Sequence, residues 1–133
     1  MVKSTSTEDE MFKIADTNNS PVYSFLTIGF DSTLIATEGG LRLFHAGEPA
    51  PFKTGTIIDS SAIQCFIFRG KELWLGSGDN GVIRYNMDTH KALVINKSNG
   101  LRSDFIYNLV TDNEGNTWVG TGFGIHKIDS TNL

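Results

Sequence analysis

The feature that most constrains this chain is an internal repeat of 40 to 44 residues. Three units each contain three short apolar runs separated by turn residues, and Leu34, Trp74 and Trp118 occupy the same position in the middle run. Leu34 and Trp74 are 40 residues apart, and Trp74 and Trp118 are 44 apart. A period of this size, made of short strands, is the length of one β-propeller blade.

The runs have the composition of β-strands. They are rich in β-branched and aromatic residues, and turn signals such as Gly39-Gly40 and Asn80-Gly81 separate them. Tyr23, Gln64 and Tyr107 precede the middle-run residue by 11, 10 and 11 positions, so the spacing within a unit is nearly constant. The runs lie at 22–26, 33–37 and 40–44; at 63–67, 73–77 and 81–85; and at 106–110, 117–121 and 124–128.

The 133 residues are therefore predicted to form one all-β segment of about three four-stranded antiparallel blades. Fourth strands are expected around Pro51-Phe52-Lys53 and at 92–95. Three blades do not close a ring, so we expect closure by oligomerisation or membership of a larger propeller. The predicted division is a flexible N-terminus at 1–10, an outer strand at 11–15, blades at 22–58 and 62–96, and three strands of a third blade at 105–129.

Composition excludes several classes of protein. The net charge is −4, from 11 basic and 15 acidic residues without a basic cluster, so we expect no nucleic-acid partner. No apolar run approaches the ~18 residues of a membrane helix, and Met1 to Glu10 is too polar for a signal peptide. We therefore expect no membrane contact by this segment. A single cysteine, Cys65, excludes an intrachain disulfide and a cysteine zinc site.

The motifs that resemble cofactor or catalytic sites have simpler explanations. Gly76 to Gly81 fits G-x-G-x-x-G, but a strand follows it and not the helix that a dinucleotide site needs. Asp112 to Asn116 lacks the loop length and flanking helices of an EF-hand. Histidines show no metal spacing, and Cys65 is interpreted as a small buried hydrophobe. We predict no cofactor, no metal and no catalytic residues.

The two tryptophans have two possible roles. Aromatic rings can stack on sugars, but Trp74 and Trp118 stand mid-strand at equivalent repeat positions, which favours packing between blades. We expect Trp118→Ala to cost about 3–5 kcal/mol, as loss of a buried aromatic side chain does. Small residues follow at Ala36, Gly76 and Gly120, where a large residue of the next blade could be admitted.

The phrases Leu73 to Ser77, Asn99 to Leu101 and Asp112 to Thr121 resemble two-component regulator propeller repeats, which build the sensor region of hybrid two-component systems. The third unit is similar to the family pattern from Asn99 to Asp129, and the second from Ile63 to Asn86. The first unit departs from it, with Leu34 in place of the usual Trp and His45 in place of the usual Asp.

The resemblance implies a non-catalytic, periplasmic, ligand-sensing propeller segment, with an oligosaccharide as the usual class of ligand. Two alternatives stay open: a propeller-type lyase with a site at the central channel, and a protein–protein interaction scaffold. The loops entering the innermost strands and the loops joining strands two and three are expected to share one face. Their candidate ligand-binding residues are Asn99, Arg102, Asp104, Phe123, Asp79 and Asn80, with Asn18 and Asn19 on the corresponding N-terminal loop.

The chain is also expected to self-associate. Three blades leave open faces and unpaired strand edges. The strand at 11–15 could complete the third blade of a second copy, and a reciprocal exchange would close a six-bladed ring as a head-to-tail homodimer.

Overall fold

The computed structural model describes residues 20–50 and 52–129. This part of the chain forms eleven strands and two short 3₁₀ helices. The strands are β1 (Val22–Thr27), β2 (Ser32–Thr37), β3 (Gly40–His45), β4 (Glu48–Ala50), β5 (Ile63–Arg69), β6 (Glu72–Ser77), β7 (Val82–Asn86), β8 (Lys91–Ile95), β9 (Ile106–Thr111), β10 (Thr117–Thr121) and β11 (Gly124–Ile128). The 3₁₀ helices are η1 (Ile57–Ser60) and η2 (Lys97–Asn99).

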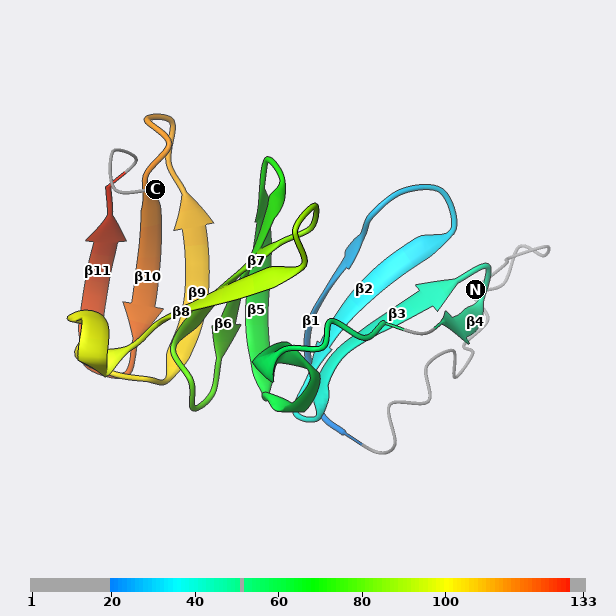
Figure 1. The fold of residues 1–133 in the computed structure, drawn as a ribbon, viewed down its shortest axis with the longest axis horizontal. Helices are drawn as coiled ribbons and strands as arrows, with labels where there is room; N and C mark the ends of the chain where they lie inside the picture. The colour runs from blue at the N-terminus through cyan, green and yellow to red at the C-terminus, as the bar shows by residue number, and fades with distance from the viewer. Residues whose placement is uncertain (1–19, 51, 130–133) are drawn as a thin grey trace, which may run out of the picture.

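The strands form three antiparallel sheets that stand side by side as propeller blades (Figure 1). Blade 1 has the order β1-β2-β3-β4, blade 2 the order β5-β6-β7-β8, and blade 3 the order β9-β10-β11. The first strands, β1, β5 and β9, contact one another in sequence, so they form the inner edge of the row. The predicted all-β propeller architecture is confirmed.

The fourth strand of blade 1 begins earlier than predicted. It was expected around Pro51-Phe52-Lys53, whereas β4 ends at Ala50 and pairs with Leu43 to His45. Ala46 and Gly47 both have positive φ angles, 53° and 80°, and make a tight turn after His45. The chain therefore returns at once, and Phe52 instead packs against the core between blades 1 and 2.

Several predictions concern residues outside the described part of the chain. These are the flexible N-terminus at 1–10, the outer strand at 11–15, and the candidate loop residues Asn18 and Asn19.

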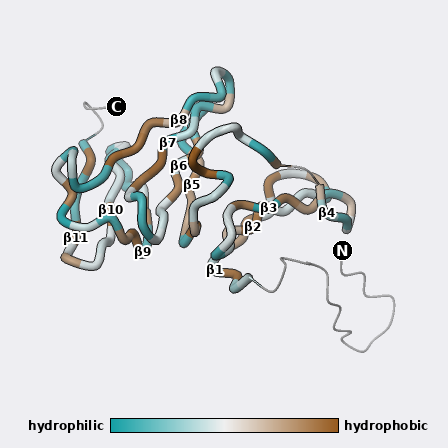
Figure 2. The backbone as a smooth tube through the Cα atoms, turned by 60° about the horizontal axis from the view of Figure 1, so that its bottom comes forward, coloured by the Kyte–Doolittle hydropathy of each residue, from teal (hydrophilic) through white to brown (hydrophobic). Residues whose placement is uncertain are grey.

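The core consists of two apolar layers, one on each side of blade 2. Alternate residues of β6 face opposite neighbours, because successive side chains of a strand point to opposite faces. Leu73 and Leu75 pack toward blade 1, and Trp74 packs toward blade 3; all three are almost fully buried. Figure 2 shows the result as hydrophobic stretches along the middle strands and a hydrophilic turn between β7 and β8.

Gly76 permits blade 3 to approach blade 2 closely. A Cβ atom at this position would lie 2.6 Å from Cγ2 of Ile106 on β9 and 2.5 Å from Sγ of Cys65. Ile106 is fully buried there. The prediction that the small residue after the aromatic admits a large residue from the next blade is therefore confirmed at Gly76.

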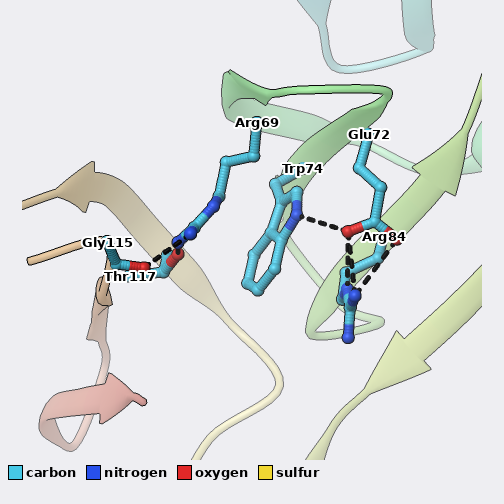
Figure 3. Close-up of polar contacts among 6 residues, drawn as sticks. All are labelled: Arg69, Glu72, Trp74, Arg84, Gly115 and Thr117. Carbon is cyan, nitrogen blue, oxygen red and sulfur yellow. Dashed lines mark hydrogen bonds and ion pairs between the residues drawn. The ribbon is translucent and has the colours of Figure 1, made fainter. Parts of the chain in front are cut away.

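A polar cluster around Trp74 joins the same two blades (Figure 3). The indole Nε1 of Trp74 donates to Glu72 Oε1 at 3.1 Å, and Glu72 in turn accepts from Arg84 at 2.8 and 3.1 Å. Arg84 and Arg69 lie against the indole, with guanidinium carbons 4.8 and 5.4 Å from a ring centroid.

Arg69 extends this cluster to blade 3. It donates to the hydroxyl of Thr117 and, at 2.5 Å, to the carbonyl oxygen of Gly115. One guanidinium from blade 2 thus contacts both the indole of its own sheet and the β9–β10 hairpin of the next (Figure 3).

Trp118 differs from Trp74, and its predicted burial is wrong. Trp74 is fully buried between blades 2 and 3, whereas Trp118 is only partly buried, on the face of blade 3 that points away from blade 2. Its Nε1 donates to Asp112 at 2.8 Å, and Lys127 lies 5.6 Å from the ring. Among the described residues no fourth sheet covers this face, so the expected 3–5 kcal/mol cost does not apply to Trp118.

Candidate ligand-binding face

The loops predicted to share a face do meet in the structure. The Gly81 amide in the β6–β7 turn donates to the Asp104 carbonyl at 2.8 Å, and the Gly78 amide donates to that of Ala62 at 2.9 Å. In blade 3, the Gly122 amide donates to the Phe105 carbonyl at 3.2 Å. These backbone bonds fix the turns between second and third strands against the loops that lead into the inner strands.

Each inner strand carries an irregularity at the same place beside these loops. The pairing register shifts between Val22 and Ser24 in β1, between Ile63 and Cys65 in β5, and around the equivalent position in β9. The residues without a ladder partner are Tyr23, Gln64 and Tyr107. A β-bulge redirects a side chain, and bulges are common beside functional sites. We call these three residues the bulge row.

Side chains of neighbouring blades meet beside the bulge row. The Tyr23 hydroxyl donates to Glu38 Oε2 at 2.7 Å. A Cβ atom built at Gly78 would lie 3.5 Å from Gln64 Nε2 and 3.8 Å from the ring of Phe105. The side chains of Gln64 in blade 2 and Phe105 at the start of blade 3 therefore both lie next to Gly78.

Aromatic rings continue the surface in blade 3. The rings of Phe105 and Tyr107 lie 4.7 Å apart, and the Tyr107 ring reaches 3.9 Å from a Cβ built at Gly122. Tyr23 and Tyr107 are 44% and 59% exposed, so their rings and hydroxyls are accessible from solvent. Amide, carboxylate and phenol groups thus lie beside exposed rings on one face of three blades.

The hydrogen bond to Glu38 affects the acidity of Tyr23. Donation to a carboxylate favours the neutral phenol and raises the pKa of Tyr23 above its ordinary value, and a hydrogen bond with the Gln64 side chain acts in the opposite direction. Tyr23 is therefore a neutral donor and acceptor at physiological pH.

Two of the predicted ligand-binding residues, Asn99 and Asp104, use their side chains in hydrogen bonds within their own loop. Asn99 Oδ1 accepts from the Asn96 amide at 3.0 Å and closes a capping box around η2. Asp104 Oδ1 accepts from the Lys97 amide at 2.9 Å, which ties the same loop to the start of β9. These side chains hold the loop in shape.

Asp79 and Asn80 are similarly engaged in the β6–β7 turn. Asn80 Nδ2 donates to Ser61 Oγ at 3.0 Å and to Asp79 Oδ1 at 3.1 Å, and its amide donates to Ser77 Oγ. Their geometry is that of turn formers with part of each side chain still facing solvent.

Arg102 and Phe123 remain available. Phe123 is 73% exposed, and the Arg102 side chain is exposed while its backbone amide donates to His126 Nε2 at 3.3 Å. Within residues 20–50 and 52–129 the Arg102 guanidinium has no hydrogen-bond partner. Of the six predicted residues, these two have the side chains best placed to contact a ligand.

Sequence reasoning missed the bulge row as a candidate site, although the signal was present. Tyr23, Gln64 and Tyr107 are the residues whose constant spacing defines the repeat. A polar or aromatic residue repeated at the start of each inner strand, next to a turn, is such a signal. The bulge itself has no sequence signal in a single chain.

The single cysteine, Cys65, lies on β5 beside Gly76. Burial raises the pKa of the Cys65 thiol to about 11, which fits its interpretation as a packed hydrophobe. In the described ranges no three His, Cys, Asp or Glu side chains gather as a metal site. No helix in that same part of the chain is both long and apolar enough to cross a membrane.

Comparison with known proteins supports the family resemblance. Residues 100–123 match the sequence model of the two component regulator propeller family. They begin at Gly100, directly after η2, and contain the inner strand β9 and the β10 strand of blade 3. The predicted resemblance to this family is thereby confirmed. No curated protein matches the chain significantly in sequence.

Solved structures share the fold. The extracellular domain of BT4673 from B. thetaiotaomicron, described as part of a hybrid two-component system, aligns with a TM-score of 0.76 and 19% identity over 93% of this chain. The extracellular domain of BT3049, from the same organism and similarly described, aligns with a TM-score of 0.65 and 22% identity over 82% of this chain. A streptogramin B lyase aligns with a TM-score of 0.51 and 12% identity over 81% of this chain.

The chain spans a small part of these proteins. It covers 16% of BT4673, 15% of BT3049 and 40% of the lyase. At these identities the likeness is one of fold. The two B. thetaiotaomicron structures are described as extracellular domains of hybrid two-component systems.

Proposed function

We propose that this chain is a non-catalytic, ligand-binding β-propeller segment of the kind found in the periplasmic sensor region of hybrid two-component regulators, and that its ligand is an oligosaccharide. The observation that carries the proposal is the bulge row, in which three successive blades direct an accessible polar or aromatic side chain to one face. The matched family repeat lies in blade 3 and includes Tyr107.

The chemistry of this face suits a sugar. Exposed rings such as Tyr107 and Phe123 can stack on the apolar face of a pyranose. Gln64 and the Tyr23–Glu38 pair offer donors and acceptors for hydroxyl groups, and Arg102 offers a fork for two oxygens. A row that extends over three blades fits a chain of several sugar units better than a single small molecule.

The experiment is a titration of isotope-labelled chain with a panel of plant cell-wall and host glycosaminoglycan oligosaccharides, followed by amide shifts. We expect shifts at Gln64, Tyr107 and Phe123, and no turnover of the sugars. Shifts restricted to the opposite hairpins at 69–71 and 113–116 would contradict the proposed site. Turnover would favour the lyase alternative.

Variants locate the contact. Tyr107→Ala and Arg102→Gln should each weaken binding by about tenfold, the effect of losing one stacking or hydrogen-bonding group worth about 1.4 kcal/mol. The matched control is Phe30→Ala, since Phe30 is also an exposed aromatic residue, 92% accessible, but lies in the β1–β2 hairpin at the other end of the strands. Equal weakening by all three variants would contradict the site.

A further inference from the structure

Glu38 gives the blade 1 end of the bulge row a chemistry that the other two blades lack. It directly follows β2 and begins the β2–β3 turn, and Gly78 and Gly122 hold the same place after β6 and β10. The Glu38 side chain is exposed, and its Oε2 accepts from the Tyr23 hydroxyl at 2.7 Å. A carboxylate therefore lies beside the row in blade 1, where the other blades have only a glycine.

Two hydrogen bonds determine which groups around Tyr23 remain free for a ligand. Tyr23 has a single hydroxyl proton, and this proton is donated to Glu38. A hydrogen bond from the Gln64 side chain acts to lower the pKa of Tyr23, so in this bond the amide donates and the phenol oxygen accepts. Among the described residues Glu38 Oε1 has no hydrogen-bond partner. The free groups are therefore acceptors, the second carboxylate oxygen above all.

The Glu38 carboxylate also keeps its negative charge unpaired in the part of the chain that the structure describes. No ion pair within residues 20–50 and 52–129 includes Glu38. Arg42 lies beside the same turn, but its guanidinium donates to the carbonyl oxygens of Leu41 and Gly39 at 3.3 and 3.2 Å. A sugar unit that carries a carboxylate or sulfate would meet a charge of the same sign here, whereas a cation would be attracted.

The Tyr23 ring adds to this preference for a cation. Tyr23 is 44% exposed, and its hydroxyl holds it next to the carboxylate. The face of an aromatic ring attracts an ammonium group through its quadrupole. A carboxylate and a ring side by side are thus suited to a protonated amine.

We propose that the oligosaccharide bound along the bulge row contains an amino sugar unit, a hexosamine with a free, protonated amine, and that Glu38 and Tyr23 bind this amine at the blade 1 end. The inference rests on the proposed function, because it names the class of sugar that this face takes. An ammonium group has three donors and a charge, whereas an N-acetylated unit has one N–H and no charge. The remaining units extend past Gln64 toward the rings of Phe105 and Tyr107.

The test compares two tetrasaccharides that differ only at the nitrogen. The chitin tetrasaccharide is N-acetylated and neutral, and the chitosan tetrasaccharide is its fully deacetylated, cationic form. Calorimetric titration of the full chain at slightly acidic pH, where the sugar amines are protonated, gives both dissociation constants. We expect the chitosan tetrasaccharide to bind about fivefold more tightly, the effect of one exposed ion pair, and added salt to reduce this preference.

Glu38→Gln separates the proposed amine site from a general attraction between an acidic chain and a cation. The new amide oxygen can still accept from Tyr23, but the charge is lost, so the two tetrasaccharides should bind equally and the neutral one as before. Glu48→Gln is the matched control and should keep the fivefold preference. Glu48 is also an exposed glutamate of blade 1, but it begins β4 and pairs with His45, at the other end of the sheet.

Tyr23→Phe tests whether the hydroxyl positions the carboxylate. This variant keeps the ring and removes the hydrogen bond to Glu38, so the ratio of the two dissociation constants should fall toward one. A purely structural loss would weaken both tetrasaccharides equally and leave the ratio unchanged. An unchanged ratio would therefore contradict the role given to Tyr23.

The results that would overturn the inference are distinct from those that would overturn the proposed function. Equal binding of the two tetrasaccharides, or a preference that Glu48→Gln abolishes as fully as Glu38→Gln, would exclude the amine site but leave oligosaccharide binding in place. If neither binds and another oligosaccharide shifts the amides of Gln64 and Tyr107, the ligand belongs to a different class of sugar. Absence of binding by every oligosaccharide would contradict the proposed function itself.

Discussion

At the scale of single residues, the repeat places identical side chains in different environments. Trp74 and Trp118 occupy the same position in successive blades, yet Trp74 is covered by blade 3 and Trp118 is partly exposed. The position of a residue within the repeat therefore determines which side of its sheet the side chain lies on. Whether a neighbouring blade covers that side determines how deeply the side chain is buried.

This difference predicts unequal costs of substitution. We expect Trp74→Ala to destabilise the chain by about 3–5 kcal/mol, because it removes a fully buried ring and leaves a cavity between two blades. Trp118→Ala should cost less than half as much. Chemical denaturation of both variants measures the free energies of unfolding, and equal losses would show that the face around Trp118 is covered in solution.

At the scale of strands and hairpins, polar side chains link the hairpin of one blade to a strand of the next, outside the apolar layers. Arg69, at the end of β5, contacts the β9–β10 hairpin through Gly115 and Thr117. In that hairpin Asp112 accepts from the amides of Glu114 and Asn116 and from the indole of Trp118. The β9–β10 hairpin is thus held by the Asp112 carboxylate within blade 3 and by the Arg69 guanidinium from blade 2.

Removal of the guanidinium should loosen blade 3. Arg69→Met keeps an apolar stem beside Trp74 but removes both hydrogen bonds, at an expected cost of about 1–3 kcal/mol. Arg69→Lys should recover only part of this, since an ammonium lacks the planar fork that reaches both acceptors. Thermal unfolding of the two variants tests this, and a loss below experimental error for Arg69→Met would contradict the bridge.

Asp112 makes the hairpin sensitive to acid. The indole of Trp118, with the amides of the turn, lowers the pKa of Asp112 from its ordinary value of 3.8 to about 2. A carboxyl whose pKa is lower in the folded state contributes stability above its unfolded pKa and loses it as pH falls through the folded value. The contribution of Asp112 should therefore be complete above pH 4 and disappear toward pH 2.

The measurement is the melting temperature of the parent chain and of Asp112→Asn from pH 5 to pH 2. We expect the two curves to converge at low pH, because the parent loses an interaction that the amide never had in full. Asn113→Asp, in the same exposed turn, is the control for a general change of charge. Parallel curves for the parent and Asp112→Asn would contradict the assignment.

At the scale of the whole molecule, the sequence predicted the architecture better than the site. Short strands, glycine turns and a constant period are local signals, so each apolar run predicted within 22–44, 63–95 and 106–128 corresponds to a strand. The run predicted at 11–15 lies outside the described residues. The exception, β4, depended on Ala46 adopting a positive φ, which its side chain does not favour and the sequence does not reveal.

The site was harder to predict because polar loop residues serve two purposes. Asn99 and Asp104 have the residue types of a ligand contact, and the structure uses them to cap η2 and fix the loop. Tyr23, Gln64 and Tyr107 looked like ordinary members of strands until the register shifts showed that they leave the ladder. Both distinctions depend on hydrogen bonds that only the folded chain displays.

The close approach at Gly76 also bears on how chains of this kind lengthen. Gly76 leaves room for Ile106 of the next blade, whereas at the equivalent Gly120 the side chain of Asn108 from the same blade fills that room. Duplication of one unit within a gene would then require the Asn108 side chain to be replaced or displaced at the new junction. The chemistry of that contact, together with the geometry of closing a circle, would limit the number of units that accumulate.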